Sequence, residues 1–238
     1  MTWKSWLNKL CLFEKWRHQK INPLVRAWWF YLFRMFFHEV QSIAASEKYT
    51  LDIGCGHGDY LMEIIKRGGS VGIGIDPLKS SLISFKNRIK GTELYHKIEI
   101  IRGVGENIPM RGNCVSICVM TGTLDHVNDP KSVLHEIYRV LVFKGYLILL
   151  ETVLLKKRKG FYSETHMHDF TIMDLKNYLK HFKIMKLTKF YPVFSQIRLG
   201  FVRELLDSFW GAKVLCFIPG FIGRYFNYSV VLAICRKN

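Results

Sequence analysis

Residues 51–58 read Leu51-Asp52-Ile53-Gly54-Cys55-Gly56-His57-Gly58, and this stretch decides the expected fold. The apolar run at 49–53 is typical of a short buried strand, and a helical pattern begins after the last glycine. Glycines allow positive φ angles and a close approach of the backbone to a ligand, and the following helix offers its positive end to that ligand. The stretch therefore predicts a nucleotide-type binding loop between a strand and a helix.

The details of this loop exclude a dinucleotide fingerprint. The pattern G-x-G-x-x-G needs a third glycine where this chain has Asp59. Asp52 precedes the first glycine, and its carboxylate would repel a pyrophosphate but attract an ammonium group. Asp76 ends the next apolar run, where an α/β nucleotide site places its acceptor for ribose hydroxyls. The two carboxylates predict a ligand with an amino acid at one end and an adenosine at the other.

Strand and helix patterns alternate after the loop. Strands are expected near 49–53, 71–75, 97–101, 115–120, 146–151, 183–191 and 228–235. Helices are expected near 59–67, 78–89, 130–141 and 173–181. This alternation predicts a parallel sheet with helices on both faces, and a ligand crevice at the carboxyl ends of the strands.

Three further motifs follow the loop in a fixed order: Val104-Gly105-Glu106-Asn107-Ile108-Pro109, Leu124-Asp125-His126-Val127 and His135-Glu136-Ile137-Tyr138-Arg139-Val140-Leu141. With the glycine loop and Asp76, they resemble the class I S-adenosylmethionine-dependent methyltransferases, in particular the methyltransferase type 11 branch. The resemblance covers residues 48–153 well and 165–190 loosely. It implies a Rossmann-like doubly wound sheet of seven strands, mostly parallel with an antiparallel last strand, plus N-terminal helices. The chain departs from the family at Ser116, usually Asp, and at Phe143-Lys144-Gly145, usually Pro-Gly-Gly.

The resemblance also implies the cofactor S-adenosylmethionine and a set of residues that contact it. In order, these are the ammonium-side partner Asp52, the loop residues Gly54, Cys55, Gly56 and Gly58, the ribose acceptor Asp76 with its neighbour Pro77, the adenine-side residues Gly105 and Glu106, and Thr121 and Gly122 beneath the methionyl part. Cys55 is interpreted as a small spacer in the loop and not as a nucleophile.

Three histidines, His126, His166 and His168, are candidates for a general base if the acceptor is a hydroxyl group. His166 and His168 would point the same way on an extended segment, which also suits a metal pair. A metal needs at least one more ligand, and the sequence identifies none, so no metal site is predicted. The alternative is that these are loop histidines whose ring nitrogens bond to the backbone.

The composition of the chain limits the kinds of binding partner and indicates the cellular compartment. A net charge of +16 and a pI near 9.6 indicate an anionic partner, which could be RNA, a lipid headgroup surface or an acidic substrate. No RNA-binding module is recognisable. The six cysteines lack C-x-x-C or Cys/His ligand spacing, which favours reduced thiols in a cytoplasmic protein.

Two apolar regions adjoin the predicted sheet. Residues 1–47 contain two amphipathic helical patterns, the second after Asn22-Pro23, that either pack as a lid or lie on a membrane surface. Arg26 and Arg34 interrupt this region well short of a membrane span. Residues 48–238 form the cofactor-binding domain. Its apolar insertion at about 192–225 either buries against the N-terminal helices or forms an acceptor pocket or membrane patch.

Taken together, the sequence predicts an S-adenosylmethionine-dependent methyltransferase with a small, apolar or lipid-linked acceptor. Two alternatives stay open at this point. One is an RNA methyltransferase, which the net charge permits. The other is an assembly protein that binds the cofactor without turnover, since a fold does not fix a function.

Overall fold

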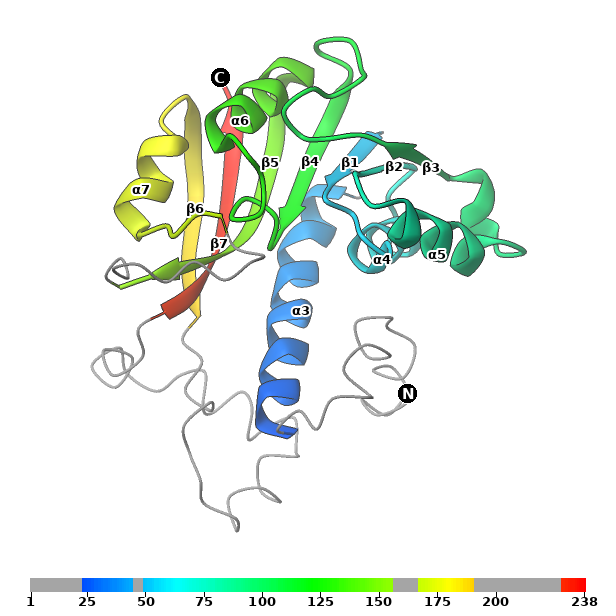
Figure 1. Ribbon diagram of the computed structural model, residues 1–238, viewed down its shortest axis with the longest axis horizontal. Coiled ribbons are helices and arrows are strands. Elements are labelled where there is room, and N and C mark those ends of the chain that lie inside the picture. Colours follow the sequence, from blue (N-terminus) through cyan, green and yellow to red (C-terminus); the bar gives the residue numbers. More distant parts are fainter. Residues whose placement is uncertain (1–22, 45–48, 156–166, 191–227) are drawn as a thin grey trace.

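The computed structural model describes residues 23–44, 49–155, 167–190 and 228–238 (Figure 1). Its elements in chain order are α3 (Pro23–Ala44), β1 (Tyr49–Ile53), α4 (Asp59–Lys66), β2 (Val71–Asp76), α5 (Lys79–Ile89), the 3-10 helix η1 (Glu93–His96), β3 (Ile98–Arg102), β4 (Val115–Thr121), α6 (Pro130–Val140), β5 (Leu141–Leu154), α7 (Ile172–Tyr178), β6 (Phe182–Phe190) and β7 (Tyr228–Lys237). The first amphipathic segment, the loop with His166 and the apolar insertion lie outside the described residues.

The seven strands form one sheet in the order β3-β2-β1-β4-β5-β7-β6. The pairs from β3 to β5 are parallel, and β7 runs antiparallel to both β5 and β6. This confirms the predicted doubly wound sheet with an antiparallel last strand. The order reverses between β1 and β4, so the carboxyl ends of these strands flank the position where such folds bind ligands.

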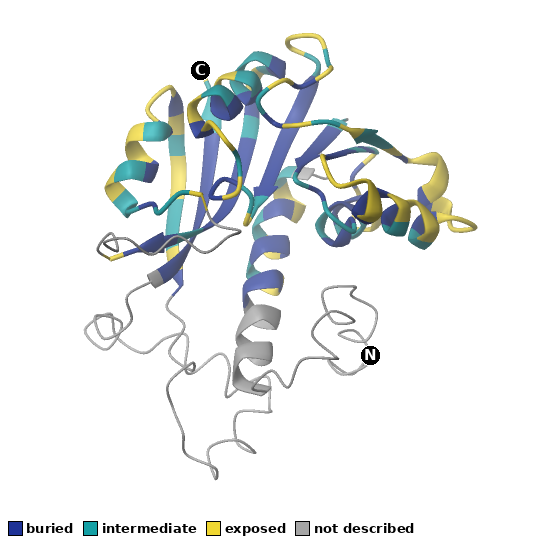
Figure 2. Cartoon of the chain, in the orientation of Figure 1, coloured by how far each residue is buried: buried dark blue, intermediate teal, exposed yellow. Residues whose placement is uncertain are grey.

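Both faces of the central strands are buried, as Figure 2 shows by their dark blue colour. On β5, Leu147 and Leu149 pack into the cluster that contains the inner faces of α6 and α7. Ile148 and Leu150 face the other way and pack with α3 and part of α4. This alternation follows from the two-residue period of a strand, and it explains why parallel strands appear in the sequence as continuous apolar runs.

The helix α3 begins at Pro23, as the Asn22-Pro23 signal predicts, and its second half lies against the sheet. Its fully buried side chains recur at helical spacing: Leu32, Phe33, Phe36, Phe37 and Val40. A hydrogen bond of 2.6 Å from Lys186 of β6 to Glu39 ties the helix to the far side of the sheet. Within the described ranges, no helix is both long and apolar enough to cross a membrane.

The start of β5 differs from the sequence prediction. The strand begins at Leu141, immediately after α6, and not near residue 146. An irregularity in register between Val115 and Ile117 of β4 absorbs the extra residues. Lys144 adopts a left-handed φ of 63° there, so a turn-like kink lies inside the strand. Sequence patterns detect the kink as a strand boundary, because a bulge and a turn use similar residues.

The packing of α3 leads to a test of stability. Phe36 is 0% exposed, and replacing it with alanine should lower the free energy of unfolding by about 3–5 kcal/mol because a cavity replaces the ring. Phe143→Ala is the matched control, since Phe143 is 66% exposed and should change stability by less than about 0.5 kcal/mol. Urea denaturation compares the two variants. Equal losses would show that α3 does not contribute to the core.

Candidate active site

The conformation of the glycine loop requires positive φ angles at three positions. Gly54, Gly56 and Gly58 have φ values of 71°, 51° and 82°, in the left-handed region that favours glycine. A Cβ atom at Gly54 would overlap the side chain of Thr123, and one at Gly58 would overlap the ring of Phe85. A Cβ at Gly56 would meet nothing within 4 Å. The loop is therefore packed at both ends and open at its middle.

Backbone hydrogen bonds hold the loop against the end of β2. The amides of Gly54 and Cys55 both donate to the carbonyl of Ile75, at 2.8 and 3.1 Å. The amide of Gly56 donates to Oδ2 of Asp76 at 2.9 Å, and Oδ1 of Asp76 accepts from the amide of Leu78 at 2.8 Å. Asp76 thus links the open middle of the loop to the start of α5. Each carboxylate oxygen retains capacity for a further donor, such as a ribose hydroxyl.

Three carboxylates gather beneath the loop. Asp52 is 1% exposed, and its Oδ1 has no hydrogen-bond partner in the described part of the chain. Burial raises the pKa of Asp52 to about 7, and the charges of Asp76 and Asp59 add to this effect. Asp59 has a counter-ion, because Arg88 approaches its Oδ1 at 2.7 Å. Asp76 and the ionised fraction of Asp52 therefore leave a local excess of negative charge that a cationic ligand would neutralise.

Arg88 also fixes the junction between the loop and α4. Its Nη1 donates to the carbonyl of His57 at 2.6 Å, while Nη2 pairs with Asp59. The sequence did not single out this arginine, because its importance depends on α5 folding back against the loop. The basic residue in the last turn of α5 is favourable for the helix in any case, so the sequence offers no separate signal.

The loop after β4 carries Thr121 and Gly122, and it is held from β5 by a buried carboxyl group. Glu151 is 1% exposed, and its Oε2 accepts from the amides of Thr123 at 3.2 Å and Leu124 at 2.9 Å. Gly122 has a φ of 55° and open space at its Cβ position. Glu151 therefore holds the backbone next to Gly122 in place, while the space at the Cβ position of Gly122 stays open. The sequence prediction did not include Glu151, which braces this part of the predicted site.

Burial raises the pKa of Glu151 to about 8, and the neighbouring carboxylate of Asp125 adds to this effect. Asp125 is 6% exposed, and its carbonyl accepts from the amides of Met167 at 2.8 Å and His168 at 3.2 Å. These bonds connect the loop after β4 to the segment before α7. The acid pair thus lies at the edge formed by the end of β4 and the loop that follows it.

The segment with Gly105 and Glu106 is clamped onto α6. Glu106 accepts from the amides of Asn128 at 2.8 Å and Asp129 at 3.4 Å, just before the helix. A Cβ at Gly105 would approach Ile53 and Val133 at 3.0–3.1 Å, so this glycine allows close packing. The structure gives Glu106 a bracing contact, and its place beside the adenine stays a prediction.

The third motif completes this clamp. Glu136 accepts from the amide of Ile108 at 2.9 Å, and Arg139 donates to the carbonyls of Ile108 and Met110 at 3.0 and 2.8 Å. Glu136 and Arg139 also pair with each other at 2.7 Å. The charged residues of the motif thus hold residues 108–110 against α6.

The structure brings two of the three candidate histidines to the loop after β4. The ring of His126 is 39% exposed, and its Nε2 lies 3.6 Å from Oδ1 of Asp125. The Nε2 of His168 lies 2.9 Å from the carbonyl of Val127, which suits a ring satisfied by the backbone. His166 lies outside the described residues. Among the residues that the structure describes, no group of three or more His, Cys, Asp or Glu side chains could hold a metal ion.

The remaining predicted contacts lie at the same edge. Burial raises the pKa of the Cys55 thiol, and the charges of Asp52 and Asp76 add to this, which fits a spacer better than a nucleophile. Pro77 is exposed beside Asp76, and its carbonyl accepts from Arg102 at 3.1 Å. Thr121 ends β4, with its carbonyl bonded to the Thr123 hydroxyl. Their contact with a cofactor stays a prediction.

The buried Glu151 leads to a test by pH. Because its native pKa is raised from 4.5 to about 8, the folded chain retains a proton that the unfolded chain releases. The stabilisation is present below about pH 4.5 and is lost as the pH rises toward 8. The side chain in Glu151→Gln does not titrate. The free energy of unfolding of this variant, minus that of the wild-type protein, should therefore increase between pH 5 and 8. Urea denaturation across this range measures the difference. Parallel curves would contradict the raised pKa.

Comparison with known proteins identifies the domain that holds this site. Residues 51–149 match the Methyltransf_11 family model, described as a methyltransferase domain. A demethylmenaquinone methyltransferase of Lactobacillus johnsonii is 33% identical over 106 residues, covering 44% of this chain and 43% of that protein. The ubiquinone/menaquinone biosynthesis C-methyltransferase UbiE of Xylella fastidiosa is 25% identical over 142 residues, covering 57% of this chain and 54% of that protein.

A solved structure shows the same fold over most of the chain. It is geranyl diphosphate C-methyltransferase from Streptomyces coelicolor, in complex with Mg²⁺, geranyl diphosphate and S-adenosyl-L-homocysteine. The TM-score is 0.63 at 14% identity, covering 86% of this chain and 76% of that one. The chain spans about half the length of the curated relatives it matches. Residues 51–149 are therefore similar to the methyltransferase domain of this family, and the matched relatives are by name methyltransferases.

Proposed function

We propose that the protein transfers a methyl group from S-adenosylmethionine to a small, apolar or lipid-linked acceptor. The observation that carries this proposal is the loop with its open middle at Gly56, placed directly above the carboxylates of Asp52 and Asp76. This arrangement combines close backbone approach, a ribose acceptor and an excess of negative charge at one position. A nucleoside that carries a sulfonium and an ammonium group matches all three.

The residues present fit this cofactor. The buried Oδ1 of Asp52 lacks a hydrogen-bond partner among the described residues, and such atoms are rare in native proteins unless a ligand or water completes them. A cationic methionyl group near the loop would compensate this carboxylate, either through the loop or through water. Asp76 would receive the ribose hydroxyls, and Gly105 and Glu106 would border the adenine.

When bound, the cofactor supplies a methyl group that is already activated for displacement. The chain therefore has mainly to hold two reactants in line, and correct alignment alone can lower the barrier of such a reaction substantially. Glu151 contributes by fixing the amides of Thr123 and Leu124, which sets the position of Gly122 beneath the methionyl part. The clamp between α6 and the adenine-side segment contributes in the same way at the other end of the site.

His126 is the stronger of the two described candidates for a general base. Its ring is 39% exposed, and Asp125 lies beside it to orient and stabilise a protonated imidazole. His168 is less suited, because its Nε2 is directed at a backbone carbonyl. We assign His126 the removal of a proton from an acceptor oxygen or carbon, and His168 the support of the loop.

The acceptor class rests on the relatives. Two matched proteins are by name a demethylmenaquinone and a ubiquinone/menaquinone methyltransferase. The family model matches residues 51–149, which include the proposed cofactor contacts. Their names favour a ring acceptor with an apolar tail over RNA. The net charge of +16 suits an acceptor presented at an anionic lipid surface.

The proposal is tested by incubating the purified chain with methyl-labelled S-adenosylmethionine and a cell extract, then separating lipid, small-molecule, RNA and protein fractions. Label should enter the lipid or small-molecule fraction. Asp76→Asn should reduce incorporation at least tenfold, because it removes a charged acceptor from the ribose site. Glu99→Gln is the matched control, since Glu99 is an exposed carboxylate on the neighbouring strand and should leave the rate unchanged. Label confined to RNA or protein would contradict the acceptor class.

A further inference from the structure

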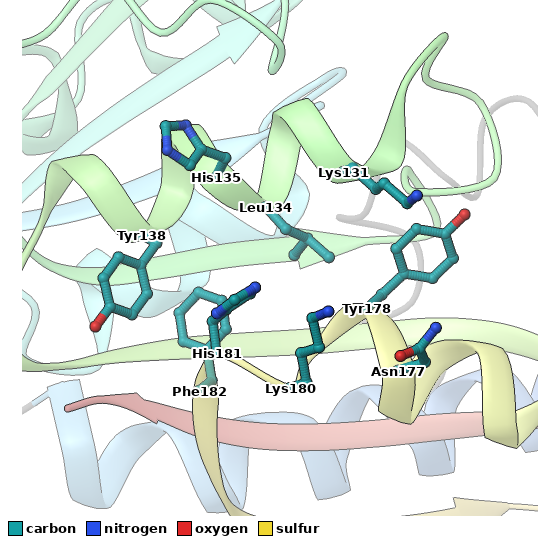
Figure 3. A pocket seen from close by; sticks show the side chains of 9 residues that line it. All are labelled: Lys131, Leu134, His135, Tyr138, Asn177, Tyr178, Lys180, His181 and Phe182. Atoms are coloured by element: carbon teal, nitrogen blue, oxygen red, sulfur yellow. The ribbon is translucent and has the colours of Figure 1, made fainter.

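A cavity that contains no residue of the glycine loop lies in a groove between α6 and the turn that joins α7 to β6 (Figure 3). Its volume is about 570 Å³, within the range of small-molecule sites. None of the residues that line it belongs to the predicted cofactor contacts. We call it the α6–α7 groove.

The inner wall of the α6–α7 groove is apolar and aromatic. Leu134 and Phe182 are 4% and 5% exposed, and Tyr138 meets Phe182 edge to face at a centroid distance of 5.3 Å. Lys237 lies over the ring of Tyr138 at 4.8 Å and fixes its orientation. Tyr178 packs edge to face on the buried Phe170 at 5.5 Å. The groove thus offers ring faces that are already ordered, so a flat ligand would cost little side-chain entropy.

The rim of the α6–α7 groove is basic. Lys131 and His135 stand one helical turn apart on α6, and Lys180 and His181 reach toward them from the opposite side, as Figure 3 shows. All four side chains are exposed, and no carboxylate lines the groove. Among the described residues, none of these four side chains has a hydrogen bond or an ion pair.

The nearest carboxylates on α6 are bonded elsewhere. Asp129 accepts from the amide of Lys131 at 3.0 Å and from the hydroxyl of Ser132 at 2.6 Å, at the start of the helix. Glu136 is engaged with Arg139. Asp129 and Glu136 interact electrostatically with Lys131 and His135, but neither carboxylate lines the groove. The lining itself therefore carries an excess of positive charge, and such a concave surface concentrates anions.

We propose that the α6–α7 groove binds a small ligand that carries a phosphate group on a flat ring. Lysine ammonium groups bind phosphate as point charges, and imidazole N–H groups can add hydrogen bonds. The aromatic wall accounts for the ring, and the volume of the groove limits the ligand to the size of a small metabolite or a lipid headgroup. The function proposed above does not require this site.

The test is a titration of the ¹⁵N-labelled full chain with phenyl phosphate, followed by NMR of the backbone amides. Amides of residues 131–138 and 177–183 should shift in a saturable way, and inorganic phosphate and benzyl alcohol, which each carry half of the ligand, should bind at least tenfold more weakly. The titration is run with and without S-adenosylhomocysteine, so a failure of cofactor binding is seen separately. Shifts that are absent or do not saturate would overturn the proposal.

Charge-reversal variants distinguish binding of phenyl phosphate in the groove from a nonspecific attraction of the anion to a basic protein. The double variant K131E/K180E should weaken phenyl phosphate at least tenfold. The control K176E/K183E changes the net charge equally at exposed lysines outside the groove and should change binding less than twofold. Equal losses in both variants would overturn the proposal.

Vesicles that contain phosphatidic acid present a phosphate group without a ring. Saturable binding of phenyl phosphate without sedimentation would support a soluble ring phosphate, and sedimentation that K131E/K180E alone abolishes would overturn the requirement for a ring. Binding of neither probe would refute the site.

Discussion

The hydrogen bond from the amide of Gly56 to Asp76 joins the two strand ends on which the site depends. It can form only because β1 and β2 are parallel neighbours whose carboxyl ends reach the same edge. The packed ends of the loop at Gly54 and Gly58 then leave its middle as the open position. The predicted nucleoside site thus follows from strand pairing and from the absence of three side chains in the loop.

The same edge concentrates buried acid groups, and this has an energetic consequence. Asp52 and Glu151 both have raised pKa values, because burial disfavours their charged forms. Folding therefore holds protons at these two positions that the unfolded chain would release. A bound cation would favour the charged form of Asp52 and so recover part of this cost. Binding of such a ligand and folding would therefore be linked through Asp52.

The sequence predicts the sheet well, because strands buried on both faces appear as apolar runs and the glycine loop marks the first crossover. The sequence also indicates that Asp52 and Asp76 belong to the predicted site, because their spacing from the glycines can be read directly along the chain. Glu151 and Arg88 could not be found in this way, because each acquires its role only when a distant element folds beside the loop. The brace from Glu106 to the residues before α6 was likewise not predicted from the sequence, and the adenine contact that the family resemblance implies for Glu106 stays a prediction. The early start of β5 at Leu141 was missed because the bulge near Lys144 resembles a turn.

The most direct test of the central claim compares two glycines that both have a left-handed backbone conformation. One of them, Gly56, lies in the predicted cofactor loop, and the other, Gly91, lies outside it. Gly56 and Gly91 have φ values of 51° and 75°, and a Cβ at either would meet nothing within 4 Å. Replacing each with alanine should cost about 1 kcal/mol of unfolding free energy, because both alanines must adopt a left-handed conformation. Calorimetry with S-adenosylmethionine should then show at least tenfold weaker binding for Gly56→Ala and native affinity for Gly91→Ala. Native affinity in both variants would contradict a cofactor bound over the middle of the loop.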